Sequence, residues 1–252
     1  MSAPIPSSEG FPLIRTVGLH GLLVTFSDTL TEAANRATLA FRGAVDERAL
    51  PAVLETSTSL ASVFVRFDTS DVGHEQMRGL LQQMLDERDW YSADLPEGRR
   101  LWRVPTVYGG GLAPQLAEAA DLAGLSETEA VESLSSARVR VLTIGFAPGQ
   151  PYLGPLGEEW NIPRQSELTP MVPAGALVAA ISQLVLFSSA TPTGWRHVGQ
   201  TGIRLFQPDA ARPFALNPGD EMEFPSVSEA EFRRLTEADP NFGGAIATEL
   251  SA

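Results

Sequence analysis

Residues 138–154 read RVRVLTIGFAPGQPYLG, and the sequence changes character at this stretch. Its first part, Arg138–Ile144, alternates polar and apolar residues, which favours a β-strand. Prolines and glycines then become frequent, and short apolar segments follow between turn residues. These segments lie at 176–181, 184–187, 203–206 and 221–224. Closely spaced short strands are typical of an all-β barrel or sandwich, which we place at residues 138–228.

The sequence up to residue 107 predicts a different kind of unit. Segments with the apolar pattern of strands lie at 21–26, 61–67 and 101–107. Apolar stripes at helical spacing lie at 31–45, after a capping Asp28 or Thr29, and at 71–90, where Asp71 is the expected cap. Alternating strands and helices predict a small α+β domain over residues 1–107, with its helices on one face of a sheet.

Two helices are expected between these units. Pro114 stands at the start of the first helix, and Gly124 ends it, because glycine adopts the left-handed conformation that terminates helices. Ser126 and Glu129 have the spacing of a capping box at the start of the second helix. We therefore expect a helical linker over residues 108–137.

The charge is acidic and unevenly distributed. The 252 residues carry a net charge of −13, and residues 220–252 hold eight acidic residues against two arginines. A last helix and a loose acidic tail are expected over residues 229–252. Because phosphate backbones repel acidic surfaces, we expect no nucleic-acid partner. No apolar run reaches the roughly 18 residues of a membrane span, and the first residues lack a signal-peptide pattern, so we expect a cytoplasmic protein.

Missing residue types narrow the chemistry. The chain has no Cys, and all 18 basic residues are Arg. Thiolate nucleophiles and cysteine metal sites are therefore excluded, as are a P-loop lysine and a Schiff-base lysine from this chain. The three histidines, His20, His74 and His197, lie far apart in the sequence, and we expect no metal site.

The loop at residues 145–154, GFAPGQPYLG, is a candidate ligand site. Glycines and prolines bracket Gln150 and Tyr152, which gives a rigid loop that still lets a ligand approach the backbone. A tight structural turn is the alternative. Trp195 and Arg196 precede an expected strand, but the sequence contains no Ser-His-Asp order, GxSxG or HExxH pattern.

Five further segments follow this loop: IPR at 162–164, VPAG at 172–175, TGW at 193–195, GQTGIRLF at 199–206 and LNPGD at 216–220. Together with GFAPGQPYLG they resemble, in order, the KipI-like family, whose members are also known as allophanate hydrolase subunit 1 or as the B subunit of 5-oxoprolinase. The resemblance implies an α+β N-terminal domain followed by a mainly-β cyclophilin-like barrel.

The same resemblance implies an ATP-dependent hydrolase that works as a complex. It implies a cyclophilin-like A-type partner chain, of the subunit 2 or C type, and, in 5-oxoprolinase, a third, TIM-barrel-like chain. Such a complex uses ATP to open 5-oxoproline to glutamate. Because this chain has no lysine for a P-loop, ATP is expected to bind through the complex.

Six residues are the candidate site residues of such a subunit: catalytic Arg164 and Gln183, and substrate-binding Gly149, Gln150, Tyr152 and Trp195. The planar fork of the arginine matches a carboxylate or phosphate. Backbone N–H groups of residues 149–154 are expected to cradle a developing oxyanion. The glutamine at 183 offers one directional hydrogen bond, and the two aromatic rings form walls of the pocket.

Each of these candidates also has a purely structural interpretation. Arg164 is placed to form a surface ion pair with Glu158 or Glu159 instead of holding a ligand. The rings of Tyr152 and Trp195 are equally suited to core packing. His197, beside an arginine in an expected strand region, is predicted to face solvent.

Five positions depart from the family pattern. Leu134 stands where the family usually has His, Val139 and Phe187 where it has Tyr, and Thr169 and Met171 where it has Arg. Thr and Met cannot hold a carboxylate bidentately, and Leu cannot transfer a proton. Three interpretations remain: a subunit of an enzyme acting on a cyclic amide, a regulatory protein of the histidine-kinase-inhibitor type, and a structural half of a heterodimer whose partner carries the active residues.

Overall fold

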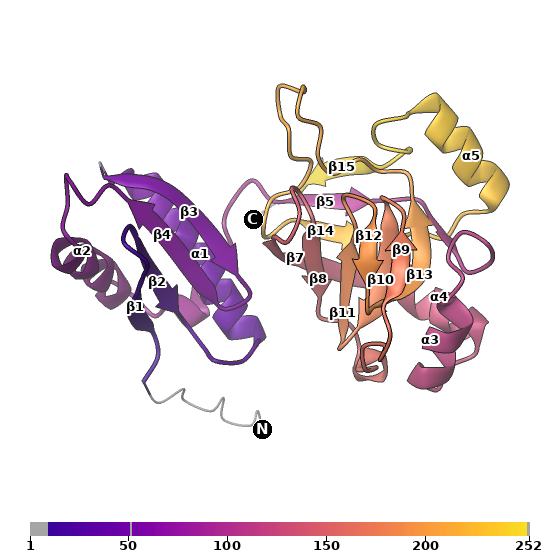
Figure 1. Cartoon of the computed structure of the whole chain (residues 1–252), viewed down its shortest axis with the longest axis horizontal. Coiled ribbons are helices and arrows are strands. Elements are labelled where there is room, and N and C mark those ends of the chain that lie inside the picture. Colours follow the sequence, from indigo (N-terminus) through magenta and orange to yellow (C-terminus); the bar gives the residue numbers. More distant parts are fainter. Residues whose placement is uncertain (1–9, 51, 251–252) are drawn as a thin grey trace. The chain divides into compact units, whose positions relative to one another are not determined.

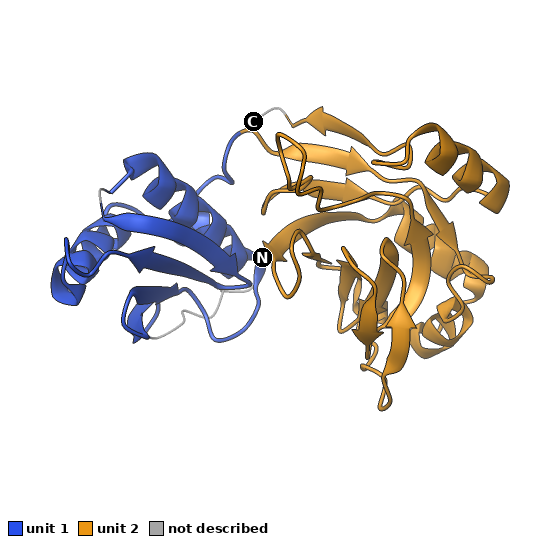
Figure 2. Ribbon diagram, turned by 45° about the horizontal axis from the view of Figure 1, so that its top comes forward, with its two compact units in different colours: residues 1–97 blue, residues 98–252 orange. Residues whose placement is uncertain are grey.

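The structure, a computed structural model, describes residues 10–50 and 52–250. The chain divides into two compact units, residues 1–97 and residues 98–252 (Figures 1 and 2). This boundary lies before the predicted one at residue 107, because the two strands on either side of Pro105 pair with strands of the second unit. Within the described residues, no helix is both long enough and apolar enough to cross a membrane.

The first unit contains a four-stranded antiparallel sheet with the order β1-β2-β4-β3. Its strands are β1 (Leu13–Val17), β2 (Gly21–Thr25), β3 (Val53–Ser59) and β4 (Ser62–Phe67). In β4, Val63, Val65 and Phe67 alternate onto the buried face. Helices α1 (Glu32–Arg48) and α2 (His74–Asp86) share one hydrophobic cluster with this face. The unit is therefore the expected layer of helices and sheet, with β1 and β3 as additional strands.

Helix α1 begins later than predicted. The hydroxyl of Thr31 accepts a hydrogen bond from the Ala34 N–H at 3.1 Å, which makes Thr31 the N-cap. The predicted caps Asp28 and Thr29 are wrong, because they belong to a preceding turn in which the Thr29 N–H donates to the Ser27 hydroxyl. The buried face of the helix otherwise follows the predicted alanine and phenylalanine stripe.

Helix α2 is shorter than predicted at both ends. It begins after Gly73, which caps it without a side-chain hydrogen bond, so the predicted cap Asp71 is wrong. The predicted end at Trp90 is also wrong, because this residue lies in a separate 3-10 turn, η1 (Trp90–Ser92), capped by Asp89. The buried stripe of the helix consists of Met77, Leu81, Met84 and Leu85.

The second unit is built on a curled nine-stranded sheet with the order β15-β5-β14-β7-β8-β11-β10-β13-β6 (Figure 1). The strands, in chain order, are β5 (Arg100–Arg103), β6 (Thr106–Tyr108), β7 (Arg138–Ile144), β8 (Pro151–Gly154), β10 (Ala176–Ala180), β11 (Gln183–Leu186), β13 (Arg196–Thr201), β14 (Glu221–Glu223) and β15 (Ile246–Glu249). Only β5 and β14 pair in parallel among these described strands. A separate ribbon pairs β9 (Thr169–Val172) with β12 (Thr191–Thr193). The predicted strand-rich unit is thus a half-barrel.

The predicted helical linker packs onto this sheet. Helices α3 (Leu116–Ala123) and α4 (Glu127–Ser136) contribute to the main hydrophobic cluster of the second unit. Gly124 ends α3 with a φ of 72°, and Ser126 and Glu129 form the predicted capping box. Leu134 and Val139, two of the family departures, are buried in this cluster and face away from solvent.

Two elements near the C-terminus differ from the prediction. No strand forms at 203–206 apart from one bridge at Phe206, because the Arg204 N–H bonds to the Asn241 carbonyl and the Leu205 carbonyl accepts from Ala215. The expected loose tail is also wrong for the described residues after α5 (Glu229–Ala238), because β15 pairs with β5 at the edge of the sheet. Its side chains are exposed, so the sequence shows no apolar pattern there.

Candidate functional site

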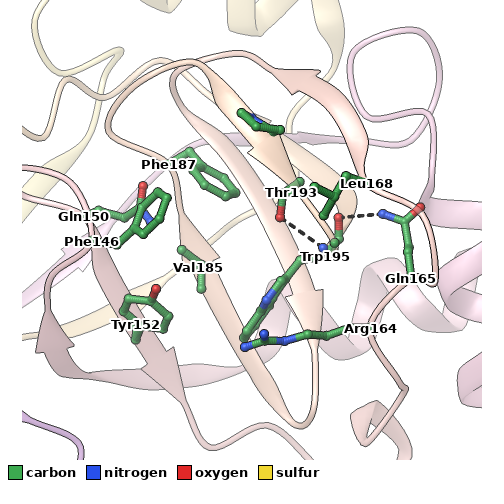
Figure 3. Close-up of a pocket in the computed structure, with 12 residues that line it drawn as sticks. Phe146, Gln150, Tyr152, Arg164, Gln165, Leu168, Val185, Phe187, Thr193 and Trp195 are labelled. Atoms are coloured by element: carbon green, nitrogen blue, oxygen red, sulfur yellow. Dashed lines mark hydrogen bonds between the residues drawn. The ribbon is translucent and has the colours of Figure 1, made fainter.

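A cavity of about 330 Å³ lies in the second unit. Its walls come from the loop before β8, the loop at 163–168 before β9, and strands β8, β11 and β12 (Figure 3). The lining residues used below are Phe146, Gln150, Tyr152, Arg164, Phe187 and Trp195. Four of the six predicted site residues are therefore brought together around one cavity.

The apolar part of this site is a second, smaller hydrophobic cluster. Side chains alternate across β10, so that Leu177 and Ala179 belong to the main cluster while Val178 and Ala180 belong to the cluster at the cavity. Apolar residues on both faces explain why this strand reads as a continuous apolar run. Trp195 belongs to the smaller cluster and is 7% exposed, so the core-packing interpretation and the wall interpretation both hold for it.

The aromatic wall carries a cation. Tyr152 and Trp195 meet edge to face, with ring centroids 6.4 Å apart. The guanidinium carbon of Arg164 lies 5.3 Å from the centroid of the Trp195 ring, within the range of a cation–π contact. Arg164 is exposed, and among the described residues no ion pair joins it to Glu158 or Glu159. Its N–H groups therefore remain available to an anion at the cavity.

Gln150 lies on a different wall of the cavity from Arg164 (Figure 3). Its side chain is 1% exposed, and its Oε1 atom has no hydrogen-bond partner among the described residues. The backbone closes a tight loop, since the Gly145 N–H donates to the Gln150 carbonyl and the Gln150 N–H donates to the Ala147 carbonyl. Within this loop Phe146 is exposed and has a φ of 71°, a left-handed conformation that is uncommon for an aromatic residue.

Gly149 shapes the loop without lining the cavity. Its φ is 73°, and a Cβ added there would lie 2.9 Å from the Leu205 carbonyl oxygen. Both features require glycine. The predicted oxyanion cradle is contradicted for β8, because this strand lies between β7 and β11 and directs its backbone to both neighbours. Tyr152 therefore contributes its ring to the site, and its backbone belongs to the sheet.

Gln183 lies apart from the cavity. It begins β11 opposite Ala180, and its Cγ would lie 3.5 Å from a Cβ added at Gly154. The two residues of the same strand region that do line the cavity are Val185 and Phe187. The structure does not place Gln183 at this cavity. A catalytic role of Gln183 stays a prediction.

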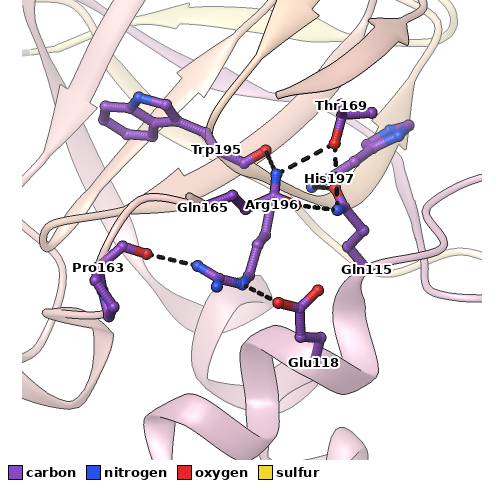
Figure 4. A network of polar contacts seen from close by, with 8 residues as sticks. All are labelled: Gln115, Glu118, Pro163, Gln165, Thr169, Trp195, Arg196 and His197. Carbon is purple, nitrogen blue, oxygen red and sulfur yellow. Dashed lines mark hydrogen bonds and ion pairs between the residues drawn. The ribbon is translucent and has the colours of Figure 1, made fainter. Parts of the chain in front are cut away.

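A polar network holds the loop at 163–168 in place (Figure 4). The Gln165 Nε2 donates to the Trp195 carbonyl at 3.0 Å and to the Thr169 hydroxyl at 3.2 Å. The Gln115 Nε2 donates to the Gln165 Oε1 at 2.7 Å, and its Oε1 accepts from the His197 N–H at 2.9 Å. The network ties the loop that carries Arg164 to the start of α3 and to β13. The sequence analysis did not single out either glutamine, although Gln165 directly follows the IPR segment and Gln115 directly follows Pro114.

Arg196 anchors the same loop from the other side. Its side chain is 7% exposed, its Nε donates to the Glu118 carboxylate at 2.9 Å, and its guanidinium also donates to the Pro163 carbonyl. Two residues of this ribbon depart from the family pattern. Thr169 joins the polar network, whereas Met171 is 61% exposed. The Thr169 hydroxyl thus accepts from the amides of Gln115 and Gln165 and adds no charge to the site.

His197 is buried, which contradicts the predicted solvent-facing position. The reason is that β13 lies between β10 and β6, with Val178 opposite His197. Burial lowers the pKa of the His197 imidazole, against the opposing effect of hydrogen bonds with Gly199 and Gln200. Its Nε2 has no partner among the described residues. The ring is therefore neutral at neutral pH.

Most of the chain matches a known family. The model of the family "Carboxyltransferase domain, subdomain C and D" matches residues 12–216. The B subunit of 5-oxoprolinase from Bacillus subtilis is 28% identical over 231 residues, which cover 89% of this chain and 96% of that protein. The corresponding B subunit from Escherichia coli O157:H7 is 41% identical over 140 residues, which cover 55% of this chain and 64% of the relative.

Solved structures show the same fold. The structure of TTHA0988 superposes with a TM-score of 0.69 at 27% identity, over 86% of this chain and 40% of that longer chain. The Kluyveromyces lactis urea amidolyase superposes with a TM-score of 0.72 over 94% of this chain and 16% of that chain. At 17% identity the second likeness concerns the fold alone. This chain thus spans less than half of either neighbour.

Proposed function

The chain belongs to the family of the carboxyltransferase domain, subdomains C and D, and on that premise we propose that it is the B-type subunit of an ATP-dependent hydrolase that opens a cyclic amide, as in 5-oxoprolinase. The observation that carries this proposal is the likeness to the 5-oxoprolinase B subunit of Bacillus subtilis over nearly the whole of both chains. The cavity beside Arg164 supports it, since it combines apolar walls with one cation.

Within this function the chain's own residues bind and orient the substrate. Arg164 holds the substrate carboxylate, because a guanidinium forms two parallel hydrogen bonds to a planar oxyanion. Trp195 keeps this guanidinium in place by its ring face, and Tyr152 and Phe187 exclude water from the substrate ring. The network around Gln165 fixes the loop on which Arg164 stands.

The cavity suits a small ligand with one anionic group better than a nucleoside triphosphate. A volume of about 330 Å³ is at the lower end of the roughly 300–1,000 Å³ of ligand pockets, and Arg164 is the one charged side chain among the lining residues. The sequence also has no lysine for a phosphate loop. We therefore propose that the complex binds ATP elsewhere, and that an A-type partner chain and a TIM-barrel-like third chain complete the enzyme.

The test is substrate-dependent ATP turnover by the co-purified complex. The chain is co-expressed with an A-type chain and a TIM-barrel-like chain, and ATP hydrolysis is measured with and without 5-oxoproline. Turnover that rises with 5-oxoproline and falls in Arg164→Ala supports the proposal. The matched control is Arg212→Ala, an exposed arginine of the same unit that does not line the cavity. A stable complex without any 5-oxoproline-dependent turnover contradicts the proposed activity.

An exposed apolar rim favours a second candidate, a regulatory binding protein of the histidine-kinase-inhibitor type. Phe146 and Leu168, at the cavity mouth, are 77% and 66% exposed, and Met171 on the neighbouring ribbon is also exposed. Such exposed apolar groups mark interaction sites. Under this candidate, Phe146→Ser and Leu168→Ser abolish inhibition of a kinase, and Arg164→Ala has no effect on it.

A further inference from the structure

The side-chain amide oxygen of Gln150 is a buried acceptor for which the described part of the chain supplies no donor. Gln150 is 1% exposed, and its Oε1 is buried without a hydrogen-bond partner among the described residues. Buried polar groups are normally hydrogen-bonded, because leaving one unpaired costs free energy. An unpaired buried amide oxygen in a cavity wall therefore points to a ligand that supplies the missing donor.

A primary amide offers a donor and an acceptor side by side. Its geometric complement is a group that presents a carbonyl oxygen and an N–H on the same edge. A cis amide has this arrangement, and a small ring forces its amide to be cis. Either assignment of the Gln150 oxygen and nitrogen fits such a partner, so the complementarity does not depend on the orientation of the amide.

Arg164 supplies a second contact of opposite character. Its guanidinium stacks on Trp195 at 5.3 Å, and its N–H groups point along its own plane. Tyr152, Val185 and Phe187 provide apolar surface in the same cavity (Figure 3). The cavity thus pairs a neutral hydrogen-bonding wall with a cation, and apolar side chains line the space that a small ring would occupy.

We infer that Gln150 determines the specificity of this cavity by pairing with the cis amide of a small lactam carboxylate whose carboxylate binds Arg164. The inference rests on the proposed function, since it names the substrate contact within it. It predicts that the protein distinguishes a lactam from a lactone of the same shape. Because Oε1 is shielded from solvent, the ligand reaches it after a shift of the loop that carries Phe146.

Direct binding to the full chain tests this inference without ATP or partner. Isothermal titration calorimetry compares 5-oxoproline with its lactone analogue, in which an ester oxygen replaces the ring N–H. The expected result is binding of the lactam at least tenfold more tightly than the lactone, because a site built to hydrogen-bond an N–H rejects the analogue that lacks it. Equal affinity for the two ligands, or no binding of 5-oxoproline, overturns the inference.

Two variants assign the discrimination to Gln150. In Gln150→Leu the lactam and the lactone are expected to bind equally weakly, whereas Arg164→Ala weakens both and leaves their ratio unchanged. Gln207→Leu, in the loop at 207–214, is the matched glutamine control. Circular dichroism and melting temperature establish that each variant is folded. Discrimination that persists in folded Gln150→Leu also overturns the inference.

The outcomes separate this inference from the proposed function. In one outcome the chain binds the lactam selectively through Gln150, but its complex shows no 5-oxoproline-dependent ATP turnover. That result supports the recognition site and contradicts the enzyme. The opposite outcome is a Gln150→Leu complex that turns over 5-oxoproline with the parent's rate and KM. That result supports the enzyme and contradicts the recognition site.

Discussion

Gln115 and Gln165 are joined by their side-chain amides, the Nε2 of the first donating to the Oε1 of the second at 2.7 Å. Gln115 precedes α3, and Gln165 follows Arg164 in the loop. The pair therefore connects a helix on the main core to the loop that carries the proposed substrate-binding arginine.

Replacing Gln165 is expected to weaken substrate binding more than turnover. In Gln165→Ala the Trp195 carbonyl loses its Gln165 donor and the Gln115 amide loses its Gln165 acceptor, so Arg164 is held less firmly. We expect KM for 5-oxoproline to rise by about tenfold, which corresponds to about 1.4 kcal/mol of binding free energy, with kcat within about twofold of the parent. Steady-state kinetics of the complex measure this, with Gln207→Ala as the control. A fall in kcat at unchanged KM contradicts the positioning role.

Asp220→Asn is expected to destabilise the second unit by about 3 kcal/mol, because it breaks a buried ion pair. Asp220 is fully buried, and its carboxylate accepts from the Arg100 guanidinium at 2.7 Å and from the Trp102 indole N–H. Urea unfolding measures the change. Glu223→Gln breaks the pair with the exposed Arg103 at the protein surface and is expected to cost less than about 1 kcal/mol. Equal effects of the two substitutions contradict this role of Asp220 in the LNPGD turn.

Gly149→Ala is expected to cost about 1–3 kcal/mol, because it puts a side chain at a left-handed φ and against the Leu205 carbonyl. Gly145→Ala in the same loop is the control, since nothing lies within 4 Å of its added Cβ and its φ is not positive. That variant is expected to be neutral or slightly stabilising. Thermal unfolding of both variants measures the two changes in stability. An unchanged melting temperature in Gly149→Ala would show that the loop relaxes around the added methyl group.

His197 is expected to make the fold less stable in mild acid. Burial lowers its folded pKa below the ordinary 6.5, so the unfolded chain binds a proton first as the pH falls. The neutral His197 ring contributes fully to the free energy of unfolding above pH 6.5. This contribution declines as the pH falls from 6.5 toward the folded pKa. Urea unfolding between about pH 5 and pH 7 measures the slope. The slope is expected to shrink in His197→Phe and to persist in His20→Gln; a parent stability that rises with acidity contradicts the assignment.

The sequence predicts those elements whose apolar pattern reports their burial. The stripe of α2, the capping box of α4 and the apolar runs of β10 and β11 all follow from local residue types. Strand β15 escapes prediction because its four side chains are exposed and only its backbone pairs with β5. The division of residues 101–107 into two strands at Pro105 is not predicted, because the strands with which they pair lie far along the chain.

The site is predicted less completely than the fold. Strand β8 and the loops around it converge on one cavity and bring together four residues that the sequence motifs mark: Gln150, Tyr152, Arg164 and Trp195. Gln183 is separated from them, since the turn before β11 directs it toward Gly154. Burial of His197 depends on β13 being an interior strand, and strand order is a tertiary property that a single sequence does not contain.

The proposed role as an enzyme component is tested most directly by an omission experiment on the reconstituted complex. Glutamate formed from 5-oxoproline and ATP is measured with all three chains and again without this one. We predict that glutamate formation requires this chain and that adding the purified chain back restores it. Glutamate formation at the same rate without the chain would contradict its role in the enzyme.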